Sequence, residues 1–190
     1  KHIMIDEFQD TSTMQWGNFL PLVVNTLSEG GRAMIVGDVK QSIYRWRNGD
    51  WRLLAEGVEH DLATFGTDNV ILEHNWRSYK EVVEFNNRFF ILAAWRLKEL
   101  YDSECGKENV YSRSITEAYS RPEQLVSRSG SGHVEIRFCG EKQEEGSDAE
   151  IMDSVVDVVN DTMHRGGELK DCVILVRNGK EGAFVADYLI

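Results

Sequence analysis

Three kinds of feature are scarce or absent in this chain of 190 residues, and each absence narrows the class of protein. Only three cysteines occur, Cys105, Cys139 and Cys172, and the lack of a CxxC pair argues against a disulfide framework or a zinc cage. Every apolar run is far shorter than the roughly 20 residues of a membrane-spanning helix, and no charged-then-apolar signal segment opens the sequence. We therefore expect a soluble, cytoplasmic protein whose cysteines are reduced.

Positive charge is also scarce. The chain has 21 lysines and arginines against 32 aspartates and glutamates, a formal net charge of −11. Because phosphate binding depends on lysine and arginine, a uniformly basic DNA-coating surface is excluded, and any contact with DNA must be local. The five histidines show no spacing typical of metal ligands: His2, His60, His74, His133 and His164.

What the sequence does have is 42% hydrophobic residues, enough for a core, in segments that alternate between two periodicities. Short apolar runs predict strands at 2–5, 33–36, 70–72, 133–138 and 172–176. Helical spacing predicts helices at 11–27, 50–62, 78–100, 148–163 and from 182 onward. Because strands that alternate with helices form parallel sheets, we expect an α/β fold with mostly parallel sheets. The stretch from about 102 to 131 is interpreted as an irregular insertion with one short helix.

Two carboxylates, Asp6 and Glu7, follow the first predicted strand. Phosphoryl-transfer enzymes need one carboxylate to hold Mg²⁺ and a neighbour to polarise the attacking water. Taken alone, such a pair could equally be a solvated strand end. The longer string DEFQDTS at 6–12 resembles the Walker B segment of UvrD-type helicases of superfamily 1. The resemblance implies that Asp6 holds Mg²⁺ and that Glu7 activates water.

A second string, VGDVKQSIYRWR at 36–47, is similar to the third motif of the same family. Gln41 is an uncharged amide at the carboxyl edge of a predicted sheet, suited to bonding a terminal phosphate oxygen. Tyr44 and Trp46 combine aromatic faces with neighbouring arginines, as in platforms for single-stranded DNA, although such aromatics are more often core residues. The resemblance implies that Tyr44 and Trp46 contact DNA and that Arg47, in the same DNA-binding cluster, pairs with acidic groups near the nucleotide.

A third string, LEHNWRS at 72–78, is similar to the fourth motif of this family, which opens the second RecA-like domain. In isolation Arg77 would be interpreted as a surface arginine at a helix start. The resemblance implies instead an arginine finger that neutralises charge on the γ-phosphate. Trp76 stands where the family usually has tyrosine, at a position associated with stacking on adenine. A further departure is Asn48-Gly49, where Gly-Ala is common.

The resemblance also implies a domain organisation. Residues 1–69 would form the C-terminal part of the first RecA-like, ATP-binding domain of a P-loop NTPase. Residues 70–190 would form the N-terminal part of the second such domain, with ATP in the cleft between the two. The strings at 132–136 and 171–178 are similar to later parts of the second domain. The residues of the second motif, at 36–47, favour the AddA/RecB-like helicase-nuclease branch.

No GxxxxGK[ST] phosphate loop occurs in the sequence, so the chain alone is expected not to hydrolyse ATP. In the family that loop lies upstream and further motifs lie downstream, and we expect the natural chain to extend in both directions.

The leading hypothesis is an ATP- and Mg²⁺-dependent DNA helicase or translocase that moves along single-stranded DNA in DNA repair or recombination. An exonuclease activity or a nuclease partner subunit is left open. One alternative is a degenerate DNA-binding or scaffold module that does not hydrolyse ATP. Another is an α/β nucleotide hydrolase unrelated to DNA, which the acidic balance favours but which leaves Tyr44, Trp46 and Arg47 unexplained.

Overall fold

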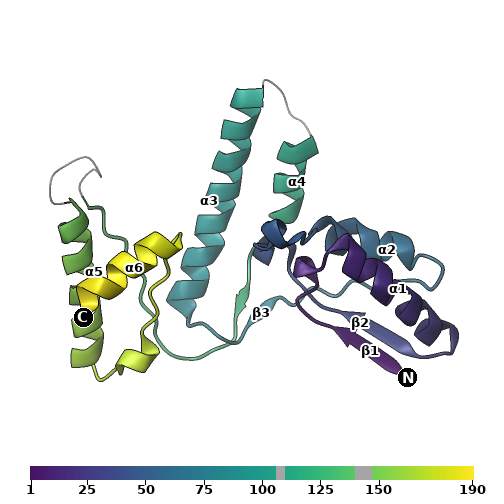
Figure 1. The fold of residues 1–190 in the computed structure, drawn as a ribbon, viewed down its shortest axis with the longest axis horizontal. Helices are drawn as coiled ribbons and strands as arrows, with labels where there is room; N and C mark the ends of the chain where they lie inside the picture. The colour runs from purple at the N-terminus through teal and green to yellow at the C-terminus, as the bar shows by residue number, and fades with distance from the viewer. Residues whose placement is uncertain (106–109, 140–146) are drawn as a thin grey trace. The chain divides into compact units, whose positions relative to one another are not determined.

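The computed structural model describes residues 1–105, 110–139 and 147–190. Its contacts divide the chain into two compact units, Lys1–Val134 and Glu135–Ile190, and Figure 1 shows the elements of each. The division at residue 69, expected from the family resemblance, concerns domains of a larger fold and stays a prediction. None of the helices in the described ranges is both long and apolar enough to cross a membrane.

The first unit begins with a βαβ arrangement. Strands β1 (His2–Ile5) and β2 (Arg32–Ile35) pair in parallel, with His2 opposite Arg32. Helix α1 (Thr13–Ser28) connects them, as expected for parallel neighbours. Ser12 caps this helix, because its side chain accepts from the backbone N–H of Gln15 while the Gln15 side chain accepts from the Ser12 N–H. Both strands and the helix lie within one or two residues of their predicted positions.

A small core holds this region together. Phe8, Trp16, Val23 and Leu62 are at most 4% exposed. The rings of Phe8 and Trp16 meet edge to face with centroids 5.1 Å apart, and Trp16 Nε1 donates to Asp61 at 2.8 Å. The latter bond ties α1 to the end of the segment predicted as a helix at 50–62. That segment is a π-helical turn, Leu53–Gly57, followed by the short helix α2 (Val58–Asp61).

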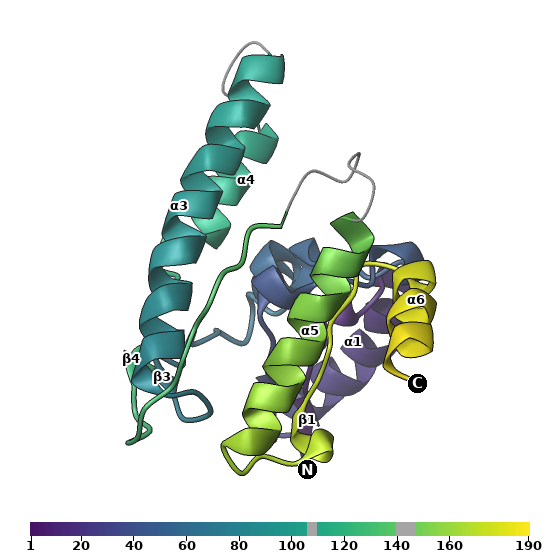
Figure 2. The ribbon, with the colours of Figure 1, turned by 90° about the vertical axis from the view of Figure 1, so that its left-hand side faces the viewer.

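The rest of the first unit is built on a second parallel pair, β3 (His74–Asn75) and β4 (Leu125–Val126). Helices α3 (Lys80–Cys105) and α4 (Val110–Ala118) lie side by side in Figures 1 and 2. The stretch predicted as irregular, 102–131, therefore contributes the end of α3, the helix α4 and the strand β4. Its residues 106–109 lie outside the described ranges.

The second unit contains helices α5 (Ser147–His164) and α6 (Gly179–Leu189). Asn178 caps α6 by accepting from the N–H groups of Lys180 and Glu181, both at 3.1 Å. The Tyr188 hydroxyl donates to Asp153 of α5 at 2.8 Å. This bond and the packing of the two helices hold the unit together.

The prediction of a strand is wrong for three segments. Residues 70–72, 133–138 and 172–176 have no regular secondary structure. Their apolar side chains are largely exposed, as shown by Val70 at 80%, Phe138 at 93% and Leu175 at 90%. A strand needs ladder hydrogen bonds from a neighbouring strand, and in the described ranges these three segments pair with no other strand. The α/β class with short parallel sheets is confirmed, whereas the RecA-like assignment stays a prediction.

Candidate functional site

The carboxylates of Asp6 and Glu7 lie just beyond the end of β1. Asp6 Oδ1 accepts from the Glu7 N–H at 2.9 Å, and Glu7 adopts a left-handed backbone conformation with φ 51°. Phe8, fully buried, anchors the turn and donates its N–H to the Val36 carbonyl at 3.0 Å. Since Asp6 and Glu7 are themselves exposed, the anchored turn presents both side chains to solvent.

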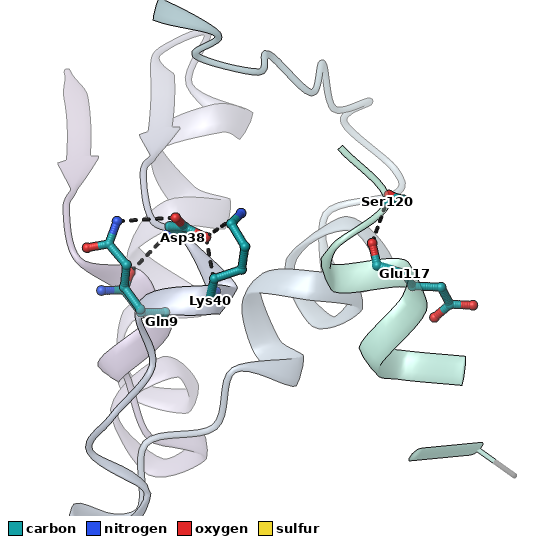
Figure 3. Close-up of polar contacts among 6 residues, drawn as sticks. Gln9, Asp38, Lys40, Glu117 and Ser120 are labelled. Carbon is teal, nitrogen blue, oxygen red and sulfur yellow. Dashed lines mark hydrogen bonds and ion pairs between the residues drawn. The ribbon is translucent and has the colours of Figure 1, made fainter. Parts of the chain in front are cut away.

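A buried amide follows two residues after Glu7. Gln9 is 1% exposed; its Nε2 donates to Glu7 Oε2 at 2.6 Å, and its Oε1 accepts from the Asp38 N–H at 3.1 Å. Figure 3 shows the approach of Gln9 to Asp38, beside Lys40. The loop after β2 passes so close that a Cβ on Gly37 would lie 2.7 Å from Gln9 Oε1. Glycine at position 37 therefore permits the contact between the two loops.

The side chain of Asp38 organises the loop that carries Gln41. Its carboxylate accepts from the Lys40 N–H at 3.0 Å, pairs with Lys40 Nζ at 2.8 Å and accepts from Gln41 Nε2 at 3.2 Å. Partial burial of Asp38 raises the pKa of its carboxyl, but the bonds from Lys40 and Gln41 together outweigh burial and leave that pKa below its ordinary value. Asp38 is thus an ionised anchor that holds the Gln41 amide at the end of β2.

These contacts bring three predicted site residues together. Asp6 and Glu7 follow β1, Gln41 follows the neighbouring strand β2, and Gln9 with Asp38 connects the two loops. Gln9 lies within the recognised string, but sequence reasoning gave it no role. Its spacing of two residues from Glu7 was the only available signal, because burial cannot be read from the string itself.

An aromatic–cation cluster, defined as Tyr44, Trp46 and Arg47, lies farther along the same loop. The two rings are 6.1 Å apart, and the Arg47 guanidinium is 5.2 Å from the Tyr44 centroid and 4.4 Å from that of Trp46. Trp46 is 70% exposed and is therefore not a core residue. Asn48, with φ 64°, turns the chain so that Gly49 forms a bridge with Ser12. The Asn48-Gly49 departure thus makes a turn anchored to the cap of α1.

Arg47 lies on the two rings, and its expected pairing with an acidic group is not seen among the contacts of the described residues. That pairing stays a prediction. The observed geometry is a cation next to two aromatic faces, which is the chemistry of a surface that stacks on bases and attracts phosphates.

Trp76 and Arg77 follow β3, and both are exposed. Asn75 Oδ1 accepts from the N–H groups of Arg77 at 3.0 Å and Ser78 at 2.8 Å, an Asx turn that leads into α3. The Arg77 carbonyl accepts from Arg128 at 2.6 Å. In the described ranges no contact joins these two side chains to the loops after β1 and β2, so their predicted convergence on one nucleotide is untested.

A cavity of about 200 Å³ lies between the loop after β2 and helix α3. Asp38 and Gln41 line one side, and Asn87, Phe90 and Tyr119 line the other. The Phe90 and Tyr119 rings are stacked with centroids 6.0 Å apart, and a bond from the Ser120 hydroxyl to the Glu117 carbonyl closes the end of α4 (Figure 3). This volume is below the roughly 300 Å³ at which typical ligand pockets begin.

The Asp6 carboxylate is suited to bind a magnesium ion. One of its oxygens accepts from Glu7, whereas Oδ2 has no hydrogen-bond partner among the described residues. No group of three or more His, Cys, Asp and Glu side chains gathers at ligand distance in those residues. Magnesium is commonly held by one or two carboxylates, with phosphate oxygens and waters completing the shell, so a single exposed carboxylate suits it when a nucleotide is bound.

Comparisons with known proteins identify relatives of this chain. Residues 1–60 match the UvrD/REP helicase N-terminal domain. One subunit of the ATP-dependent helicase/nuclease of Lactococcus lactis is 31% identical over 201 aligned positions, covering 99% of this chain and 15% of that protein. DNA helicase II of Haemophilus influenzae is 27% identical, covering 100% and 21%.

RecBCD enzyme subunit RecB of Chlamydia trachomatis is 37% identical over 90 positions, which cover 47% of this chain and 8% of that subunit. The chain thus spans about a fifth or less of the length of these relatives. The family predicted from the three motifs is confirmed, together with the likeness to the helicase-nuclease branch. Residues 1–60 thus belong to the UvrD/REP helicase N-terminal domain family, and the whole chain is similar to helicase/nuclease subunits and to DNA helicase II.

Proposed function

We propose that this chain forms part of an ATP-dependent DNA helicase or translocase that couples ATP hydrolysis to movement along single-stranded DNA. The observation that carries the proposal is the placement of Asp6, Glu7 and Gln41 at the ends of two adjacent parallel strands, where parallel sheets bind ligands. The match of the surrounding residues to the UvrD/REP domain supports it.

Each residue at this edge has a proposed role in hydrolysis. Asp6 would hold Mg²⁺, which neutralises charge on the phosphates. The Glu7 carboxylate would accept a proton from the attacking water, and the Gln41 amide would bond the terminal phosphate. Arg77 would stabilise the charge that develops on the transferred group, and Trp76 would stack on the adenine. These last two roles require the proposed division into two RecA-like domains, 1–69 and 70–190, that close around ATP.

The aromatic–cation cluster is the proposed contact with DNA. Tyr44 and Trp46 would stack on bases, each contributing roughly 1–3 kcal/mol, and Arg47 would meet a phosphate. Because a motor grips only a few nucleotides at a time, this local site agrees with an overall charge of −11. The proposed role lies in DNA repair or recombination, and the names of the helicase/nuclease relatives favour an exonuclease in the same protein or in a partner subunit.

The test is ATP hydrolysis by the natural protein that contains these residues, with and without single-stranded DNA, in wild type and in Glu7→Gln. We expect DNA to stimulate turnover and the substitution to lower kcat by at least about a thousandfold, because the proton acceptor is lost while the shape is kept. Binding of a fluorescent ATP analogue should persist in the variant.

Normal hydrolysis by Glu7→Gln would remove Glu7 from the proton-accepting role. DNA binding by a wild-type protein that never hydrolyses ATP would replace the motor with a non-hydrolysing DNA-binding module.

A further inference from the structure

Gln9 connects two loops through both its amide nitrogen and its amide oxygen, although the proposed chemistry gives it no role. Its side chain bonds Glu7 and the Asp38 backbone, and its backbone carbonyl accepts from the Ser42 hydroxyl at 3.2 Å. Ser42 lies two residues before Tyr44 in the chain. A continuous set of contacts therefore runs from the carboxylate of Glu7 to the segment that carries the aromatic–cation cluster.

A side-chain amide suits the chemistry of this connection. An ionised Glu7 can only accept a hydrogen bond and a backbone N–H can only donate one, so the residue between them must carry a donor and an acceptor on neighbouring atoms. A glutamate at position 9 would repel Glu7, and an apolar residue would leave the N–H of Asp38 without its partner. Because Gln9 is 1% exposed, water cannot readily replace the lost bonds.

We propose that Gln9 is a positioning residue that couples the aromatic–cation cluster to Glu7. Binding of single-stranded DNA at Tyr44 and Trp46 shifts the loop at 37–42. Gln9 then transmits that shift to the Glu7 carboxylate. The inference rests on the proposed function, since it assumes hydrolysis and DNA binding. The contacts available to carry this coupling form a continuous path, and it passes through the side chain and the backbone carbonyl of Gln9.

The experiment compares Gln9→Met with wild type in the natural protein. Methionine keeps the length and volume of the side chain but makes neither hydrogen bond. The matched control is Gln15→Met, which breaks the capping box with Ser12 in the same unit but leaves every bond of Gln9 in place. Steady-state kcat is measured with and without an unlabelled oligothymidine, together with Kd for ATP, Kd for the oligonucleotide and the thermal midpoint.

We expect Gln9→Met to reduce the ratio of DNA-stimulated to basal kcat at least about fivefold, while both dissociation constants stay within about threefold of wild type. Gln15→Met should lower the thermal midpoint and leave the ratio unchanged, because it removes only a cap. A wild-type ratio in Gln9→Met would overturn the proposal. So would a loss of ratio that Gln15→Met reproduces, because it would follow from reduced stability alone.

Two further outcomes are distinguishable. If Gln9→Met lacks a cooperative unfolding transition, Ser42→Ala is measured instead, since it removes only the hydroxyl that donates to the Gln9 carbonyl on the path to Tyr44; a wild-type ratio in Ser42→Ala would then overturn the coupling. If wild type shows no hydrolysis, the proposed function fails and the coupling fails with it. A hydrolysing wild type with an unaffected variant rejects the coupling alone.

Discussion

The two ends of the chain treat their apolar side chains differently. In the N-terminal region Phe8, Trp16 and Val23 are at most 2% exposed. There β1 and β2 are hydrogen-bonded neighbours that α1 connects in the chain. In the second unit and the segment that leads into it, Phe138 is 93% exposed and Leu175 is 90% exposed, and neither lies in a strand. The difference is whether a strand-like segment finds its partner within the chain. The chemistry-bearing loops rest on the region where it does.

The comparison predicts unequal effects of the same substitution. Phe8→Ala should lower the free energy of unfolding by about 3–5 kcal/mol, because it opens a cavity in the core. Phe138→Ala should change it by less than about 0.5 kcal/mol, because that ring is already exposed. Urea unfolding of the 190-residue chain followed by circular dichroism measures both. Equal effects would break the comparison by showing that residues 133–138 pack against something in solution.

A smaller effect should appear at the aromatic–cation cluster, an exposed feature that the packed region supports. Trp46→Ala should weaken binding of an oligothymidine to the natural protein by roughly 1–3 kcal/mol, because one stacking face is lost. Affinity for ATP should stay the same. Fluorescence anisotropy with a labelled oligonucleotide gives the affinity, with Trp95→Ala as a control at a tryptophan that is similarly exposed, at 60%. An equal loss at Trp95 would contradict a specific role for the cluster.

The smallest effect is electrostatic. The pKa of the Asp38 carboxyl is lower in the folded chain than in the unfolded one, so its ionisation stabilises the fold above the unfolded pKa of about 4, and this contribution is lost as pH falls through the lowered folded pKa. We expect wild type to be more stable than Asp38→Asn at pH 7 and the difference to shrink below about pH 4. Urea unfolding at several pH values checks the sign. A difference that grew on acidification would refute it.

Sequence reasoning worked best where pattern and partner lie close together. The strand at 2–5, the helix that follows it and the strand at 33–36 form one local unit, so their periodicity sufficed to place them. The position of Asp6 and Glu7 just beyond the strand at 2–5 follows from the same contiguous string, whereas their roles stay a prediction.

What sequence could not give depends on distant contacts. The apolar runs at 70–72 and 172–176 have the composition of strands, but composition cannot reveal whether a neighbour is present to bond them. Likewise, the bond from Gln9 to Asp38 spans 29 positions, and no local pattern encodes it. The predicted roles of Trp76 and Arg77 depend on a convergence that neither pattern nor the described contacts establish.

The left-handed backbone at Glu7 has a consequence for how this residue could be replaced over evolutionary time. A residue with a Cβ is disfavoured there by about 1–2 kcal/mol, whereas glycine adopts the conformation freely. Selection for a sturdier protein alone would thus favour glycine at this position. Glutamate is present instead, so the carboxylate is kept at the expense of an unfavourable backbone conformation. If Glu7 accepts the proton as proposed, lineages that abandon hydrolysis should lose this side chain early, because its replacement by glycine relieves the backbone.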